Sequence, residues 1–453
     1  MRDRARQFGL LAGLLCLTAP AAAQDACLSF PSALRQALDF DPRIAGAAAQ
    51  ADQARAGLTA AYAQNRPSVQ VFGQTGFNEV RPLDQTRDDQ FGVQASVDLY
   101  TFGQRRAAQA AARAQVDAAR QGVAAARIDV AEGIALAYLD AARGAALARL
   151  AEEEQEAYRE DAEAAEGRLE RRVITLTDAS QIRSRFAVAR SSTVDAQAAY
   201  EAALIRLGLL ADRPVSCVAP DSAVRTLAGG AAATLALTPE GVFARAKDRS
   251  FALREARSNL RAARAGLDEA KRANLPTISA NAFALTNYGE AGVFDADGNR
   301  VLNDPDDPFS GFATEDVFSG DQRVGLSLRQ DLYAGGRNRA RRADARARVS
   351  AARSDVDLQE LVLEDRVRRA FAQAKAAQTS GLALLEASQE GRTRLDATIT
   401  EYRRGTKTLT DLVLATQDYY QAAARETAAR YDFYTALVNL YAAMGTLTDP
   451  VEG

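Results

Sequence analysis

The chain alternates between two hydrophobic patterns, one typical of strands and one typical of helices. Apolar and polar side chains alternate one by one in four segments, more loosely in the first than in the others. These segments are residues 68–77, 90–100, 277–288 and 323–332. A period of two is the pattern of a strand with one apolar and one polar face. The sequence therefore predicts two β-hairpins, one over 68–100 and one over 277–333, each with a polar connection.

Each predicted hairpin is followed by a long stretch without proline, residues 103–172 and residues 336–403. A helix of about 70 residues is about 100 Å long, and it must bury a stripe against other helices. The remaining predicted helices are 28–65, with a break near Asp41, 177–210, 241–273 and 410–445. Because these helices are about half as long as the two rods, we expect each half of the chain to contain a hairpin, one full-length rod and two half-length rods stacked end to end.

The two halves are copies of one another. Asp98-Leu-Tyr100 recurs as Asp331-Leu-Tyr333 at an offset of 233 residues, and Asn65-Arg-Pro67 matches Asn274-Leu-Pro276 at an offset of 209. The offsets differ by 24, so the second copy has 24 extra residues within its hairpin. A regular duplication indicates two similar units. In chain order we predict a first repeat at 24–211, a linker rich in proline and glycine at 212–236, and a second repeat at 237–447.

The first 23 residues have the composition of an export signal. A basic start precedes an apolar run over 8–17, and Ala21-Ala-Ala23 forms a small-residue cleavage site. The alternative is a buried N-terminal helix. Beyond residue 23 there is no run of about 18 apolar residues, so no helix is expected to span a bilayer. Four strands with a lipid-compatible face cannot close a barrel alone, whereas three chains would supply twelve strands.

Composition narrows the range of functions. The formal net charge is −3, which argues against nucleic acid as a partner. The absence of histidine removes the commonest general base and the commonest metal ligand, so we expect no enzyme, no metal site and no cofactor. Residues 290–321 are strongly acidic, and Asp295-Ala-Asp297-Gly-Asn299 is faintly similar to a calcium loop without its final glutamate. A hydrophilic surface loop is the favoured interpretation.

Two cysteines, Cys27 and Cys217, remain after the predicted signal. One opens the first repeat and the other follows its end. In an oxidising compartment they could form a disulfide that joins the two repeats. Two unpaired thiols are the alternative, and spacing alone leaves both open.

At these residues the sequence resembles the TolC family of outer-membrane efflux and type I secretion channels. The resemblance is carried by Asp98-Leu-Tyr100, Asp331-Leu-Tyr-Ala-Gly-Gly336, Tyr402-Arg-Arg-Gly-Thr-Lys-Thr-Leu-Thr-Asp411 and Asn439-Leu-Tyr-Ala-Ala-Met-Gly445. It implies a mainly α fold with membrane β-strands, in which a trimeric twelve-stranded β-barrel continues as a periplasmic α-helical barrel. It also implies a passive export duct in the outer membrane of a Gram-negative cell. The implied partners are a periplasmic adaptor and an inner-membrane transporter of ABC or RND type.

The resemblance also implies roles for particular residues. Tyr402, Lys407 and Asp411 match positions that constrict or latch the closed periplasmic tip, and Asp178 is the first-repeat equivalent of Asp411. Relatives carry a second acid where this chain has Leu414, so a double acidic ring is not expected. The alternative for the two aspartates is that each caps a return helix. A set of four arginines could contact acids or the adaptor, or could be solvated helix ends: Arg171, Arg172, Arg403 and Arg404.

Three aromatic residues, Tyr100, Phe102 and Tyr333, lie where strand meets helix, and either form a membrane-interface belt or pack at the junction.

Among functions, the rival to a duct is a periplasmic adaptor with long helical hairpins. An adaptor would show one helical hairpin and separate β-rich domains, whereas this chain has two repeats. An enzyme on a helical scaffold would need a cluster of acid, base or nucleophile, and the sequence presents none. The cargo cannot be inferred from the sequence.

Overall fold

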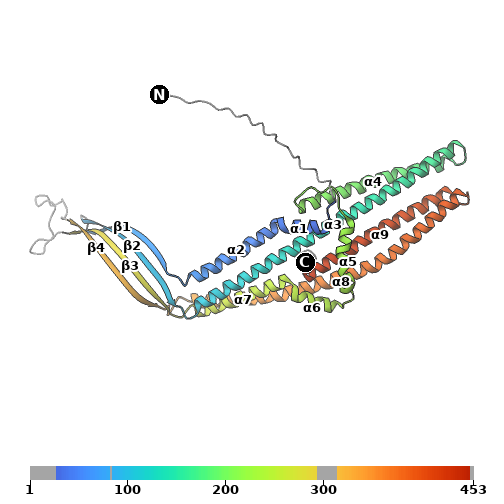
Figure 1. Cartoon of the computed structure of the whole chain (residues 1–453). Helices are drawn as coiled ribbons and strands as arrows, with labels where there is room; N and C mark the ends of the chain where they lie inside the picture. The colour runs from blue at the N-terminus through green and yellow to red at the C-terminus, as the bar shows by residue number, and fades with distance from the viewer. Residues whose placement is uncertain (1–26, 82–83, 293–313, 449–453) are drawn as a thin grey trace, which may run out of the picture.

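The computed structural model describes residues 27–81, 84–292 and 314–448, and shows an elongated molecule with a β-sheet at one end and long helices extending from it (Figure 1). The predicted signal at 1–23 and most of the acidic loop at 290–321 lie outside the described residues. The elements are α1 (Phe30–Phe40), α2 (Pro42–Ala63), β1 (Ser68–Arg81), β2 (Asp84–Tyr100), α3 (Gln104–Glu170), α4 (Leu176–Leu210), α5 (Pro220–Leu235), α6 (Pro239–Arg249), α7 (Phe251–Arg272), β3 (Thr277–Gly292), β4 (Thr314–Arg329), α8 (Arg337–Arg403) and α9 (Leu409–Met444).

The duplication is visible in the element boundaries. The bounds of α1 and α2 recur in α6 and α7 at the offset of 209, and those of α3 recur in α8 at 233. The expected single helix over 241–273 is wrong, because the second copy breaks at Ser250, where the first breaks at Asp41. Both side chains cap the next helix: Asp41 Oδ1 accepts the N–H of Arg43, and Ser250 Oγ accepts the N–H of Leu253.

The helices form a wall one layer thick. In the half next to the sheet the order of contacts is α2, α3, α7, α8, and in the far half it is α4, α3, α9, α8. Thus α4 continues the layer of α2, and α9 continues that of α7, alongside two rods of 67 residues each (Figure 1). In the described part of the chain, no helix combines the length and hydrophobicity needed to cross a membrane.

The four strands form one antiparallel sheet in the order β1-β2-β3-β4. Register places Val71 beside Val93 and Val93 beside Ala284, while Val324 lies beside Ala282 on the same face. This face is apolar and unusually exposed, with Val71 81% and Val324 88% exposed. Glutamines, serines and asparagines predominate on the other face, which also carries Phe72, Phe283 and Leu285. The first hairpin was expected to have strands at 68–77 and 90–100 with a polar connection between them; these bounds are wrong in part, since β1 continues to Arg81 and β2 begins at Asp84.

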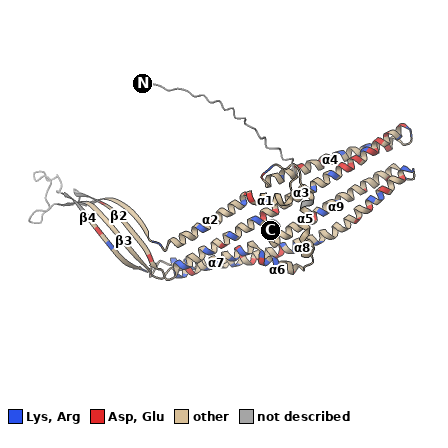
Figure 2. Ribbon diagram, in the orientation of Figure 1, with Lys and Arg blue, Asp and Glu red and all other residues tan. Residues whose placement is uncertain are grey.

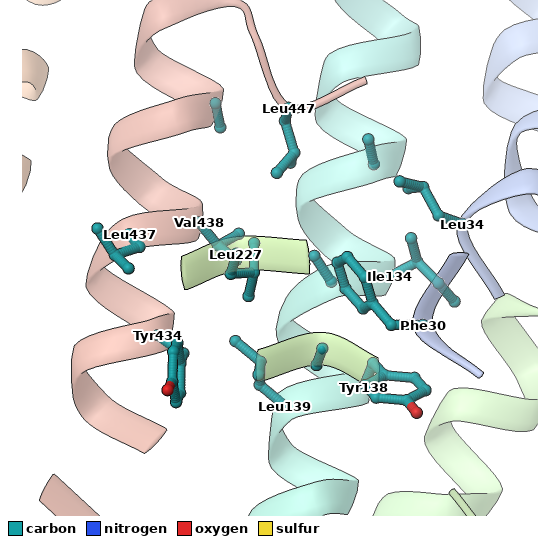
Figure 3. Packing of buried hydrophobic residues seen from close by; sticks show 14 of the residues in the cluster. Phe30, Leu34, Ile134, Tyr138, Leu139, Leu227, Tyr434, Leu437, Val438 and Leu447 are labelled. Atoms are coloured by element: carbon teal, nitrogen blue, oxygen red, sulfur yellow. The ribbon is translucent and has the colours of Figure 1, made fainter. Parts of the chain in front are cut away.

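The largest apolar core lies at mid-length, where α1, α5 and α6 pack against the long helices; we call this region the waist. The segment predicted only as a linker, 212–236, contains α5, whose buried Leu227 points into this core beside Val438 (Figure 3). Tyr138 is fully buried, and its hydroxyl lies 2.8 Å from the carbonyl oxygens of Leu28 and Ala219. The waist therefore joins both repeats into one body.

Candidate functional site at the helical tip

The end of the molecule farthest from the sheet consists of two equivalent turns, one joining α3 to α4 and one joining α8 to α9 (Figure 1). Gly405 has φ +79° in the second turn, and the equivalent residue of the first turn, Arg172, has φ +59°. Only glycine adopts this conformation without cost, so the first turn holds a strained arginine. Lys407 and Leu414 are exposed at this end.

Both predicted aspartates belong to capping boxes. Thr175 Oγ1 accepts the N–H of Asp178 at 3.2 Å, and Asp178 Oδ2 accepts the N–H and the hydroxyl of Thr175 at 3.1 and 2.8 Å. Thr408 and Asp411 repeat this arrangement at 2.9 Å for the amide and 2.7 Å for the hydroxyl. The helix starts are therefore fixed by the threonine one residue before each helix, with the aspartate in reciprocal support.

In each capping box, only one of the two carboxylate oxygens accepts hydrogen bonds. All of the cap bonds go to Oδ2, and Oδ1 of Asp178 and of Asp411 has no hydrogen-bond partner among the described residues. The bonds from Thr408 lower the pKa of Asp411 below its ordinary value, and the charge of Lys407 adds to the effect. Asp411 therefore stays ionised throughout the neutral range and presents a free oxygen, so capping and pore lining are compatible.

Tyr402 connects the two repeats at the tip. The guanidinium of Arg168, on α3, lies over its ring with Cζ 4.4 Å from the ring centre, and burial raises the pKa of the Tyr402 hydroxyl. The same residues face Asp161, a half-buried carboxyl on α3. Burial, together with the charge of the neighbouring Glu160, raises the pKa of Asp161 to about 6, although Arg168 and Arg403 oppose the shift.

Sequence reasoning missed Asp161, which lies among the many acids and alanines of α3 with no motif to single it out. It also left open the role of the tip arginines. Arg171 is bound locally, since its Nε donates to the carbonyl oxygen of Gly167 at 2.8 Å, which satisfies a helix C-terminal carbonyl. Arg403 acts on Asp161 through its charge.

The cysteines meet at the waist, far from the tip. Cys27 and Cys217 are joined by a disulfide with their Cα atoms 4.7 Å apart. The adjoining bridge pairs Leu28 with Val218, and the N–H of Leu28 donates to the carbonyl oxygen of Cys217 at 2.9 Å. The bond ties the start of the first repeat to the segment that follows it. No group of residues that could hold a metal ion occurs in the described part of the chain.

A two-faced sheet, continued by a wall of long helices that ends in two capped turns, is the arrangement of channel-forming outer-membrane proteins. The model of one family, outer membrane efflux protein, matches residues 33–211 and 242–446, which is most of the chain. The chain belongs to the outer membrane efflux protein family.

Relatives and solved structures agree with this class. The chain is 23% identical over 436 residues to the outer membrane protein TolC of Vibrio cholerae serotype O1, covering 91% of this chain and 90% of that one. It is 26% identical over 207 residues to the TolC protein of Escherichia coli, a match that spans 45% of this chain and 39% of that protein. The crystal structure of the outer membrane protein VceC of Vibrio cholerae superimposes with a TM-score of 0.71 at 19% identity, covering 92% and 96%. That likeness concerns the fold.

Proposed function

We propose that three copies of this chain form a passive duct that carries exported material from the periplasm through the outer membrane. One observation carries the proposal: the sheet has an apolar and a polar face, is open at both edges among the described strands, and continues directly into a one-layer helical wall. Open strand edges cannot face lipid, because their backbone groups would lack partners. Three sheets joined edge to edge give twelve strands and a closed tube, with the apolar face toward lipid.

The helical wall supports the same arrangement. Apolar side chains remain exposed along its two free edges, including Val188 and Val194 on α4 and Leu382 on α8. In a ring of three, α4 of one copy adjoins α8 of the next, so these side chains are buried between copies. The waist elements α1 and α5 pack against the long helices, and a duct requires that they lie outside its bore.

The tip is proposed as the entrance. Asp178 and Asp411, with one carboxylate oxygen free in each, supply up to six negative charges when three copies meet, and such a ring favours cations. Tyr402 with Arg168 and Asp161 braces the two repeats against one another, and Lys407 completes the turn. Opening the entrance then means separating the α8–α9 pair from the α3–α4 pair at this brace.

The partners proposed are a periplasmic adaptor and an inner-membrane transporter, because a passive duct needs a separate source of energy. Whether the transporter is of the ABC or the RND type does not follow from this chain. The rival function, that the chain is itself an adaptor, is not favoured, because the chain has two repeats with paired strand hairpins. We propose no chemistry for the duct, in keeping with a family of channel proteins.

Planar lipid bilayers test the duct directly. Purified protein added to one side is expected to give discrete, uniform current steps, and the same protein boiled before addition serves as the control. A preparation that enters bilayers without conducting, or that never enters them, would argue against a duct. Deletion of the chain in its host should abolish export of a cargo whose transporter is still made and still in place.

A further inference from the structure

A groove of about 660 Å³ lies where β2 turns into α3, between α3 and the C-terminal end of α7. Its walls include two aromatic side chains, Tyr100 and Phe102, whose rings meet edge to face with centroids 4.6 Å apart. Three arginines complete it: Arg105, Arg106 and Arg272. The exposed aromatic rings and the arginines lie together at this end of the long helices. The proposed entrance is at the opposite end and does not involve them.

The groove opens on the lipid side of the wall. Tyr100 pairs with Ile278, which follows the alternation of the apolar sheet face. Because the proposed duct turns the apolar sheet face toward lipid, the position of Tyr100 on that face puts the groove outside the bore.

The groove is lined by three arginines and one carboxylate, that of Asp268, which pairs with Lys271 and not with an arginine. Arg105 is held by backbone oxygens, donating to Gln64 at 2.9 Å and to Leu99 at 3.3 Å. Arg272 donates to the carbonyl oxygen of Asp268, whose carboxylate already accepts a hydrogen bond from Lys271 at 3.2 Å. Arg106 is exposed and has no acidic partner in the part of the chain that the structure describes.

The helix starts near the groove are also rich in positive charge. Neither long helix has an acidic residue in its first turn, and the start of α8 has four arginines before its first acid, Asp344. These arginines are Arg337, Arg339, Arg341 and Arg342. Figure 2 shows these basic residues at the sheet end of the rods. At the offset of 233, Tyr333 and Arg339 repeat Tyr100 and Arg106, so the pairing of ring and cation occurs in both copies.

We propose that this groove binds the headgroup phosphate of an anionic phospholipid in the periplasmic leaflet of the outer membrane. The phosphate meets Arg106 and Arg272, the rings of Tyr100 and Phe102 lie at the level of the lipid glycerol, and the acyl chains follow the apolar sheet face. A zwitterionic lipid fits less well, because its ammonium group would lie among arginines. The inference rests on the proposed placement of the sheet in the membrane.

Native mass spectrometry of the intact, detergent-purified assembly tests the site. Delipidated protein is mixed with phosphatidylglycerol, with phosphatidylcholine of the same chains, or with inorganic phosphate. We expect one phosphatidylglycerol retained per copy, weak retention of phosphatidylcholine, and no displacement by millimolar phosphate. Arg106→Gln and Arg272→Gln should each weaken phosphatidylglycerol retention roughly fivefold. Arg120→Gln is the matched control, because Arg120 is exposed on the same face of α3 two heptads farther from the sheet.

Equal retention of the two lipids, or equal loss in Arg106→Gln and Arg120→Gln, would overturn the proposal. Displacement of lipid by inorganic phosphate would also overturn it, since the groove would then be a general anion site. Bilayer conductance of the same preparations is measured in parallel. A conducting assembly without lipid preference removes the headgroup site and leaves the duct standing, whereas an assembly that does not conduct opposes the duct whatever its lipid retention.

Discussion

The long helices begin in one way at the sheet end of the molecule, and the return helices begin in another way at the tip. At the sheet end, α3 and α8 begin after Gly103 and Gly336, both in the left-handed conformation, with arginines and no acid in the first turn. At the tip, α4 and α9 begin with threonine–aspartate capping boxes. The first turns of the rods at the sheet end therefore carry arginines, of which Arg337 pairs with Asp331, and the tip places a carboxylate at every helix start. The difference suits lipid phosphate at one end and a cation-favouring entrance at the other.

The largest effect is expected from removing the glycines of the sheet end. Gly336→Ala forces a side chain into a left-handed conformation, at a cost of about 1–2 kcal/mol per copy. The temperature at which the assembly dissociates in detergent should fall accordingly. Gly57→Ala, inside α2 with open space around it, should be neutral or stabilising by up to about 1 kcal/mol. If the two variants behave alike, the left-handed start is not a constraint.

Breaking a capping box at the tip should have a smaller effect. Thr408→Ala removes the side chain that accepts the N–H of Asp411, and caps of this kind are worth about 1 kcal/mol. Hydrogen exchange should accelerate in the first turn of α9 and remain unchanged at the waist. Thr410→Ala is the control, since Thr410 is exposed and makes no hydrogen bond among the described residues. Equal exchange in the two variants would show that the box does not hold the helix start.

The two roles of Asp411 can be separated by charge. Asp411→Asn keeps an oxygen acceptor for Thr408 and removes the negative charge, so cation preference in bilayers should fall while heat stability is nearly kept. In the unaltered protein the pKa of Asp411 is lowered, so its charge is present above the ordinary value of 3.8 and lost only when the pH falls through the depressed value. Cation preference should therefore persist at pH 4.5. Unchanged currents in the variant would remove Asp411 from the pore.

The smallest effect concerns the brace at Tyr402. The pKa of Asp161 is raised to about 6, so the folded tip binds a proton more readily than the unfolded chain does. Between the ordinary value of 3.8 and about 6, stability should rise as the pH falls, because the proton removes a half-buried charge. Asp161→Asn should flatten this dependence in thermal dissociation measured from pH 7 to pH 4. If stability depends on pH equally steeply in Asp161→Asn, other carboxyl groups cause the dependence.

Sequence reasoning succeeded where a pattern repeats. The alternation of the strands, the length of the proline-free rods and the two offsets together predicted the mainly α fold with a two-faced sheet, because each depends on many residues at once. The rods were expected at 103–172 and 336–403 and occur as 104–170 and 337–403. The predicted bounds differ by one or two residues at the helix ends, where local capping contacts decide the first and last helical residue.

The failures have local causes. The helix α5 was hidden by Gly229 and Gly230, because its stability comes from Leu227 packing into the waist and not from helix propensity. The helix break at Ser250 depends on a single serine cap. Because serine is also common inside helices, its presence did not predict the break. Asp161 and the junction groove depend on residues far apart in sequence, which only the fold brings together.

We propose that one copy is incomplete and that three copies close the tube. Native mass spectrometry of the assembly extracted from outer membranes measures the number of copies. We expect a particle of three copies of the processed chain, stable to delipidation and dissociating only on heating. A soluble particle with the mass of a single chain and no affinity for detergent or lipid would contradict it.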